Sequence, residues 1–317
     1  MIRNVGMWRS AISTNSRSAS EGDPTRGLPT SLLTLRVGKF VLTQFLAIGL
    51  LSAIANGEDT AKKDVDVSAV KTPSPLRKVM DESISWNEFF ADEQSATPMT
   101  ARVVMRWANN TRGSEDGMTV LFLNAGRPEA VCCMYPWMNS LHHEFDSLSR
   151  GKLIAKRDGI VVWAPEKPGV TFLTVPDADL PAENPAGRMR QMKTLAAQFS
   201  STMLGWRADK SDREELRLLP QPLYRYESKR SDLVDGAVFA FVQGTDPESL
   251  LLLEAIKTTD RTQWQFAFAR RTSGELEGRH KDKVVWHADR FPENGDPKST
   301  HRALGRPLDP SLIEALK

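Results

Sequence analysis

Apolar and polar positions alternate along two separate stretches of the chain, which is the pattern of half-buried β-strands. In the first stretch, the alternating segments lie between turn residues and predict strands at 102–107, 118–123, 130–135 and 141–147. A hairpin is expected next, from 152–156 to 160–163, with Asp158-Gly159 as its turn. This stretch therefore predicts an antiparallel sheet of about five strands.

The second stretch repeats this order of strands. Segments rich in β-branched and aromatic residues predict strands at 223–227, 237–242, 249–255 and 264–270, with a final hairpin from 275–279 to 284–286. Gly- and Pro-containing turns separate the second and third strands in both stretches. We therefore expect a second antiparallel sheet of similar size.

The two stretches also match residue by residue. Met105-Arg106-Trp107 is similar to Tyr224-Arg225-Tyr226, which lies 119 positions later. The same spacing places Asp116-Gly117 on Asp235-Gly236, Phe122 on Phe241, and Pro128-Glu129 on Pro247-Glu248. After an insertion of four residues, a spacing of 123 places Phe145 on Phe268, Gly151 on Gly274, Leu153 on Leu276, and 161–163 on 284–286. These matches predict an internal duplication.

A helix is expected before each sheet. Asn184 is a good N-cap and Pro185 suits the first helical position. Apolar side chains then recur at helical spacing at Met189, Met192, Leu195, Ala196, Phe199 and Met203. Ser85, Trp86, Phe89 and Phe90 suggest a shorter helix before the first sheet. These apolar stripes are interpreted as core, not as a cofactor site.

The predicted fold class is α+β, mainly antiparallel β, built from internally duplicated helix-plus-sheet units related by a pseudo-twofold axis. Each small sheet is expected to have one apolar face to bury, and two copies would most economically cover one another. The expected domains are a first repeat at 81–163, a Pro-rich connector at 164–184, a second repeat at 185–286 and a mostly irregular tail at 287–317, with a short helix near 310–316.

The N-terminal region has the plan of an export signal. Residues 40–55 are apolar, follow Arg36 and Lys39, and end with small residues at Ala53 and Ala55. The run is shorter than the roughly 20 residues of a membrane span, so cleavage after Ala55 is expected, with no stable span afterwards. A retained anchor and an organelle transit sequence are the alternatives. Residues 1–39 read as an extension or a misplaced start, and 56–80 as a disordered linker.

Charge narrows the choice of partners. Residues 1–55 hold six of the 42 basic and two of the 40 acidic side chains, leaving 36 bases against 38 acids in the remainder. A nucleic-acid partner is therefore excluded, because binding phosphates requires a basic surface. The two cysteines, Cys132 and Cys133, are neighbours and are interpreted as buried thiols on a strand, with a vicinal disulfide as the alternative.

One constellation of residues has candidate chemistry. His142, Glu144 and Asp146 alternate along a predicted strand and so share one face, whereas their counterparts at spacing 123 are Gln265, Ala267 and Ala269. An imidazole beside two carboxylates suits general acid–base catalysis or a divalent metal. The competing interpretation is an ordinary solvent-facing strand.

The other candidate residues receive structural interpretations. His143 is expected to be a half-buried core residue, while His280, His287 and His301 lie at turns or in the tail and are expected to be structural or solvated. Asp177 and Asp179 fit a solvated loop. The chain lacks a nucleophile elbow, a phosphate-binding Gly-rich loop, His-Glu-x-x-His and Cys-x-x-Cys. No cofactor is assigned.

The run from Pro222 to Tyr226, followed by residues 235–248, resembles a family of uncharacterised planctomycete exported proteins over roughly residues 80–290. The resemblance implies a bacterial setting and transfers no activity, cofactor or catalytic residue. We therefore expect an exported, periplasmic or extracellular, non-catalytic protein that binds a protein partner or a glycan through its β faces. The alternative is a hydrolase or metal-dependent enzyme centred on His142, Glu144 and Asp146.

Overall fold

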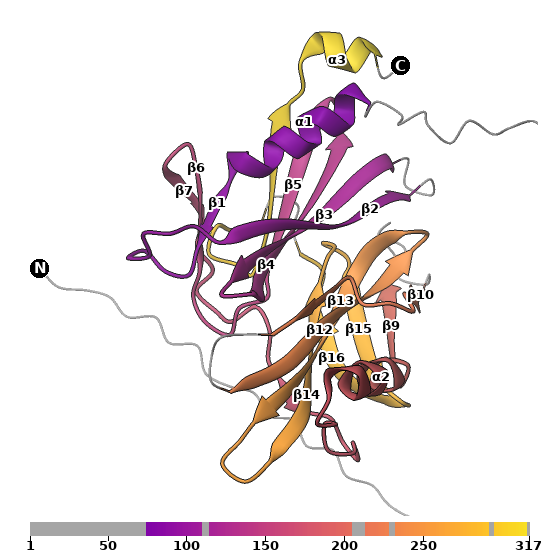
Figure 1. Ribbon diagram of the computed structural model, residues 1–317. Coiled ribbons are helices and arrows are strands. Elements are labelled where there is room, and N and C mark those ends of the chain that lie inside the picture. Colours follow the sequence, from indigo (N-terminus) through magenta and orange to yellow (C-terminus); the bar gives the residue numbers. More distant parts are fainter. Residues whose placement is uncertain (1–73, 110–113, 205–212, 228–231, 292–294, 316–317) are drawn as a thin grey trace, which may run out of the picture. The chain divides into compact units, whose positions relative to one another are not determined.

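The computed structural model describes residues 74–109, 114–204, 213–227, 232–291 and 295–315. These residues form antiparallel sheets with a few short helices (Figure 1). The predicted α+β class with mainly antiparallel β structure is confirmed. In the part of the chain that the structure describes, no helix has the length and apolar character needed to cross a bilayer. The predicted export segment at 40–55 lies outside the described residues.

The first half is organised around a meander of consecutive strands. The strands are β2 (Thr100–Asn109), β3 (Ser114–Asn124), β4 (Arg127–Trp137) and β5 (Ser140–Ser147). A fifth strand, β17 (His301–Pro307), comes from the C-terminal tail and pairs with β5, giving the order β17-β5-β4-β3-β2. The four sequence-predicted strands are confirmed, but the tail is not mostly irregular as expected.

A smaller layer covers this first meander. It contains α1 (Pro75–Ser83), the 3-10 helix η1 (Ile84–Trp86), and a sheet of β1 (Glu88–Phe90), β6 (Ile154–Arg157) and β7 (Ile160–Trp163). The prediction of a helix through Phe89 and Phe90 was wrong, because both lie on β1. The linker predicted at 56–80 also extended too far, since Ser74 caps α1 and Pro75 occupies its first turn.

The second half forms one larger sheet. Its meander is β11 (Tyr224–Tyr226), β12 (Leu233–Gln243), β13 (Asp246–Lys257) and β14 (Thr262–Arg270), with β8 (Leu173–Thr174) from the connector at the far edge. The strands β9 (Phe199–Leu204), β15 (Glu275–His280) and β16 (Lys283–Ala288) form the covering part. Because β10 (Arg213–Leu218) pairs with both β9 and β12, the two parts merge into one nine-stranded sheet.

The second predicted helix ends earlier than expected. α2 spans Pro185–Ala196, and Phe199 and Met203 lie on β9 instead. Residues four positions apart share a face on a strand as well as on a helix, so the spacing of these two residues did not distinguish the alternatives. Burial alternates along β9, and its buried residues include Phe199 and Met203.

The two halves have the same strand pairing, residue for residue. Trp107 pairs with Gly117 on β2 and β3, and Tyr226 pairs with Gly236 on β11 and β12. The later pairs also agree. Cys132 with Phe145 corresponds to Leu251 with Phe268, where the first residues are 119 positions apart and the second 123. Ala155 with Trp163 corresponds to Gly278 with Trp286, both at the spacing of 123. A bulge follows Phe122 in one half and Phe241 in the other. The strand order of the meander and hairpin is therefore the same in both halves.

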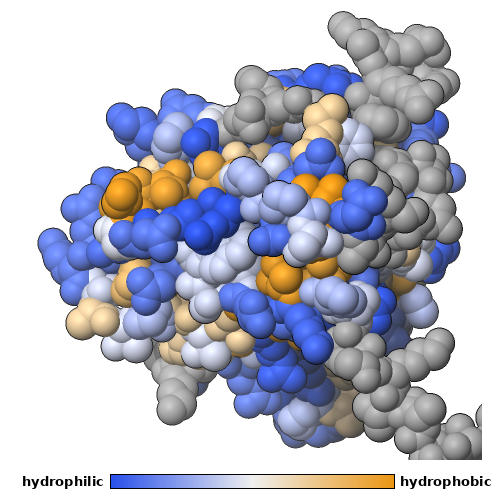
Figure 2. All heavy atoms as spheres, turned by 90° about the horizontal axis from the view of Figure 1, so that it is seen from above, coloured by the Kyte–Doolittle hydropathy of each residue, from blue (hydrophilic) through white to orange (hydrophobic). Residues whose placement is uncertain are grey.

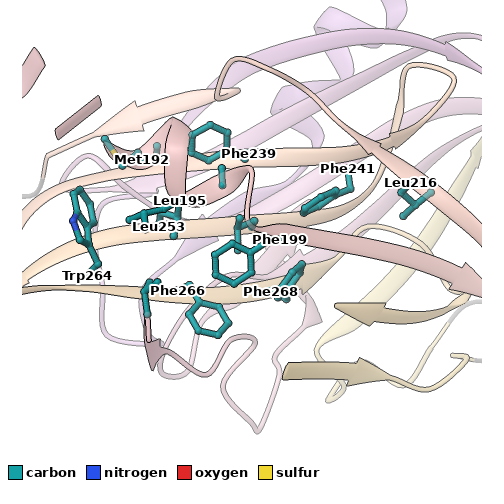
Figure 3. Close-up of a cluster of buried hydrophobic side chains, with 14 of the residues drawn as sticks. Met192, Leu195, Phe199, Leu216, Phe239, Phe241, Leu253, Trp264, Phe266 and Phe268 are labelled. Carbon is teal, nitrogen blue, oxygen red and sulfur yellow. The ribbon is translucent and has the colours of Figure 1, made fainter. Parts of the chain in front are cut away.

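The central strands of each meander are buried on both faces, whereas the sequence suggested one apolar face. One face packs against its own helix and small strands, as Figure 3 shows for the second half, where Met192 and Leu195 of α2 and Phe199 of β9 meet Phe239, Leu253 and Phe266. The other faces meet each other: Leu121 and Val131 cluster with residues of β12, β13 and β14 such as Val238, Leu250 and Ala267. This explains the nearly continuous burial along β4 and β13.

Two further predictions concern the C-terminal helix and the two cysteines, and both are confirmed. α3 (Pro310–Ala315) confirms the short C-terminal helix. Cys132 and Cys133 are free and buried on β4, as expected. They point to opposite faces of the sheet, with Cys132 in the first-half core.

Candidate functional site

The polar face of β5 is directed into the protein and not into solvent. Glu144 and Asp146 are buried, with 8% and 1% of their surfaces exposed, while His142 is half-buried. The interpretation of this face as an ordinary solvent-facing strand was therefore wrong. Buried carboxylates require charged or hydrogen-bonding partners.

His301 is one such partner. The pairing of β17 with β5 places His301 opposite Asp146, with Nδ1 2.8 Å from Oδ1 of Asp146 and Nε2 3.2 Å from Oε1 of Glu144. Only 1% of His301 is exposed. His301 is therefore structural, which is one of the two roles expected for it, but it begins the strand β17 and does not lie in an irregular tail.

Arg271 completes the cluster from the second half. Its guanidinium forms an ion pair with Asp146, and its backbone N–H donates to the carbonyl of Glu248 at 2.9 Å. Tyr135 donates its hydroxyl to Glu144 over 3.3 Å. Both carboxylates of β5 are thus engaged by neighbours on β4, β17 and the segment after β14.

Burial sets the protonation of this cluster. It lowers the pKa of His301 to about 4, against the opposing effect of Glu144. At neutral pH the ring therefore has a single N–H, and Asp146 is the nearer acceptor. Burial also raises the pKa of the Cys133 thiol well above its ordinary value, although Arg271 acts in the opposite direction. A buried thiol of this kind is a poor nucleophile.

His142 occupies a different place from the two carboxylates. Its ring stacks on Tyr135 with a centroid separation of 5.7 Å, and it lies beside Gly305 of β17. The three sequence-predicted residues therefore share a strand face, but only Glu144 and Asp146 meet at His301. Among the described residues, no group of three or more His, Cys, Asp and Glu side chains is arranged to hold a metal ion.

The other histidines and the acidic loop have local roles. His143 lies on the opposite face of β5, where Nδ1 accepts from the Asn87 amide at 2.7 Å and Nε2 is 3.1 Å from the Ser83 hydroxyl. It is fully buried, not half-buried, and burial lowers its pKa to about 3. His280 contacts Gln198 and His287 contacts Glu275. Asp177 and Asp179 are exposed, as expected.

A second buried polar cluster surrounds Glu254 on β13, the residue 119 positions after Tyr135. Glu254 accepts from Arg127 at 3.0 Å, Tyr226 at 2.9 Å and Gln265 at 2.8 Å, and also pairs with Arg150. Gln265 is the counterpart of His142, so the matching face of the second half also carries a buried polar cluster, although its other two counterparts are Ala267 and Ala269. The sequence held one signal for this cluster: at the spacing of 119, Tyr135 falls on Glu254, which is an acidic residue within an otherwise apolar strand.

An open groove lies where β2 faces the start of β11. It has a volume of about 500 Å³, and its lining residues are Arg102, Val103, Val104, Pro222, Leu223, Tyr224 and Arg225. The Arg102 guanidinium lies over the Tyr224 ring, 5.3 Å from its centroid. Arg225 forms an ion pair with the buried Asp235 at 2.6 Å. The volume is within the usual range of ligand sites, and the sequence reasoning did not identify this groove.

No protein-family model, curated protein or solved structure matches this chain significantly.

Proposed function

We propose that this chain is an exported, non-catalytic protein that binds a protein partner or a glycan in the groove between β2 and residues 222–225. The groove is the observation that carries this proposal. It is open and has a volume suited to part of a ligand. It also presents a cation, an aromatic ring and apolar side chains together, a mixture common at binding surfaces.

The broad β faces are less suited to binding than the sequence suggested. The meander faces are buried, and on the side seen in Figure 2 the apolar side chains form separate patches between polar ones. Among the large hydrophobic side chains that are exposed in the described region, the one aromatic side chain is that of Trp137, which is 40% exposed. We therefore place the proposed binding site in the groove and not on a β face.

The second candidate function is a hydrolase or metal-dependent enzyme centred on His142, Glu144 and Asp146. The contact of His301 with both carboxylates favours it, because paired imidazole and carboxylate groups orient proton transfer. Its weakness is that Asp146 is already neutralised by Arg271 and hydrogen-bonded to His301, and that both carboxylates are almost inaccessible to a substrate. Loss of hydrolysis of a panel of ester, peptide and glycoside substrates in Glu144→Gln would favour this function over binding.

The proposal includes a common origin of the two halves. Matching residues pair with matching partners in the two meanders and in the two hairpins, and this agreement supports a common origin. So does a recurring ion pair between helix and meander: Arg77 of α1 with Asp116, and Arg188 of α2 with Asp235, both at 2.7 Å. Export rests on the signal-like segment at 40–55, and family membership rests on the resemblance described above.

The binding function is tested by filling the groove. Val103→Trp is expected to abolish retention of the chain on a glycan array or on a peptide array, because the ring would occupy the space beside Arg102. Val284→Trp is the matched control, since both valines are exposed strand residues, at 39% and 49%. Equal retention by both variants would contradict binding in this groove. Mass analysis of the chain expressed with its N-terminus in a bacterial host is expected to show cleavage after Ala55 and release across the inner membrane.

A further inference from the structure

We infer that the ligand of the groove is an extended peptide segment that pairs with the edge of β2 and places an acidic side chain on Arg102. This inference rests on the proposed binding function and specifies its ligand. β2 is the last strand in the order β17-β5-β4-β3-β2, so one side of its backbone faces away from the sheet. An exposed strand edge is a template for an added strand, and its backbone groups supply the hydrogen bonds.

The pairing segment is confined to the beginning of β2. Thr100 to Val103 are paired regularly with β3, whereas bulges interrupt the ladder at Val104 and Ala108. Thr245 also covers the far end of β2: its hydroxyl lies 2.9 Å from the N of Ala108 and 2.8 Å from its carbonyl oxygen. The four residues before the first bulge are exposed. A short added strand can therefore reach this part of the edge.

The opposite wall of the groove supplies side chains and not a second pairing edge. Pro222 has no N–H, and the N–H of Leu223 already donates to the carbonyl of Val238 at 2.8 Å. The Tyr224 ring is covered on one side by Arg102. A bound segment would thus take its backbone hydrogen bonds from β2 and contact the side chains of residues 222–225.

Charge indicates the character of the bound segment. Arg225, the other arginine that lines the groove, is neutralised by Asp235. Arg102 is exposed and forms no ion pair with a carboxylate in the described part of the chain. A guanidinium held on an aromatic ring at a strand edge favours a carboxylate on the incoming segment.

Two other occupants fit less well. Pairing of β2 with β2 of a second copy would bring two Arg102 side chains towards one another, and like charges on adjacent strands are destabilising. A glycan would require an aromatic face for stacking, but Tyr224 is covered by Arg102 and lies against Tyr226, with centroids 5.9 Å apart. The observations therefore favour an acidic peptide.

Fluorescence polarisation with short labelled peptides tests the inference on the full chain. The probe alternates glutamate and valine; a second peptide alternates lysine and valine, and a third is the acidic peptide with alternate backbone nitrogens methylated. We expect the acidic peptide to bind, the basic peptide not to bind, and methylation to weaken binding at least about tenfold by removing hydrogen bonds. Arg102→Gln is expected to weaken binding about tenfold, whereas Arg190→Gln, at an exposed position on α2, should leave it unchanged.

Several outcomes would overturn this inference. They are equal binding of the acidic and basic peptides, indifference to backbone methylation, or equal affinity of Arg102→Gln and Arg190→Gln. If no peptide binds and the protein instead forms a dimer that Val103→Trp disrupts, the partner at the β2 edge is a second copy of this chain. If no peptide binds but a glycan does, and Val103→Trp abolishes that glycan binding, the peptide ligand is refuted and the proposed binding function stands. Binding that no groove variant affects would refute both.

Discussion

Nδ1 of His301 lies 2.8 Å from Oδ1 of Asp146, although the two residues are 155 positions apart in the chain. The contact exists because the C-terminal strand β17 returns to the first half and pairs with β5. Since Arg271 from the second half also binds Asp146, a single carboxylate links the tail to both halves. This cluster is therefore a structural junction at the place where the sequence suggested catalysis.

Replacing His301 should destabilise the fold. In His301→Ala, Asp146 stays buried but loses the hydrogen bond from the His301 ring, and a cavity is left beside Glu144, which together should lower the free energy of unfolding by about 2–3 kcal/mol. His287→Ala is the control, because His287 is about half exposed and its contact with Glu275 is at the surface; a change within about 0.5 kcal/mol is expected. Urea unfolding measures both, and equal losses would show that His301 has no special role.

Two buried histidines should make stability depend on pH. Burial lowers the pKa of His301 to about 4 and of His143 to about 3, both below the ordinary value of 6.5. Between these values the unfolded chain binds protons that the folded chain does not, so the free energy of unfolding should fall as pH decreases from 6.5 towards 4. The expected fall is on the order of a few kcal/mol. Urea midpoints at pH 7, 6 and 5 test this, and a constant midpoint would contradict the burial of both rings.

The sequence predicted most of the strands because their apolar residues alternate, and the spacing between matching residues agreed with the observed pairing. It did not predict β17. Burial along this strand decreases from the buried His301 to three exposed residues at its end, and the strand contains Gly305 and ends at Pro307, so it lacks the alternation that marks a half-buried strand.

The candidate site was predicted only in part, for a related reason. Glu144 and Asp146 are two positions apart on one strand, and local spacing is enough to place them on one face. Their partners His301 and Arg271 come from distant segments, and the pairing of β17 with β5 that joins them is not encoded by any local pattern. The groove at Arg102 depends equally on the packing of the two halves.

Matching glycines should respond alike in the two halves. A Cβ added at Gly117 would overlap the Trp107 ring, and one added at Gly236 would lie 2.6 Å from the Tyr226 ring. Gly117→Ala and Gly236→Ala should each lower the free energy of unfolding by roughly 1–3 kcal/mol through overpacking. Gly151→Ala should have little effect, since no neighbour lies within 4 Å of its added Cβ. Thermal unfolding of the three variants would contradict the matched packing if only one of the first two were destabilised.

The Glu254 cluster should depend more on Arg127 than on Arg150. The Arg127 side chain is 5% exposed and the Arg150 side chain 42%, although both pair with the fully buried Glu254. Removing a buried partner leaves a charge poorly compensated, so Arg127→Met should cost about 3 kcal/mol, whereas Arg150→Met should cost about 1 kcal/mol or less. Adding Glu254→Leu to Arg127→Met should recover part of the loss, because the stranded carboxylate is then gone. Denaturant unfolding of the single and double variants measures this coupling, and additive losses would show that the two side chains do not stabilise one another.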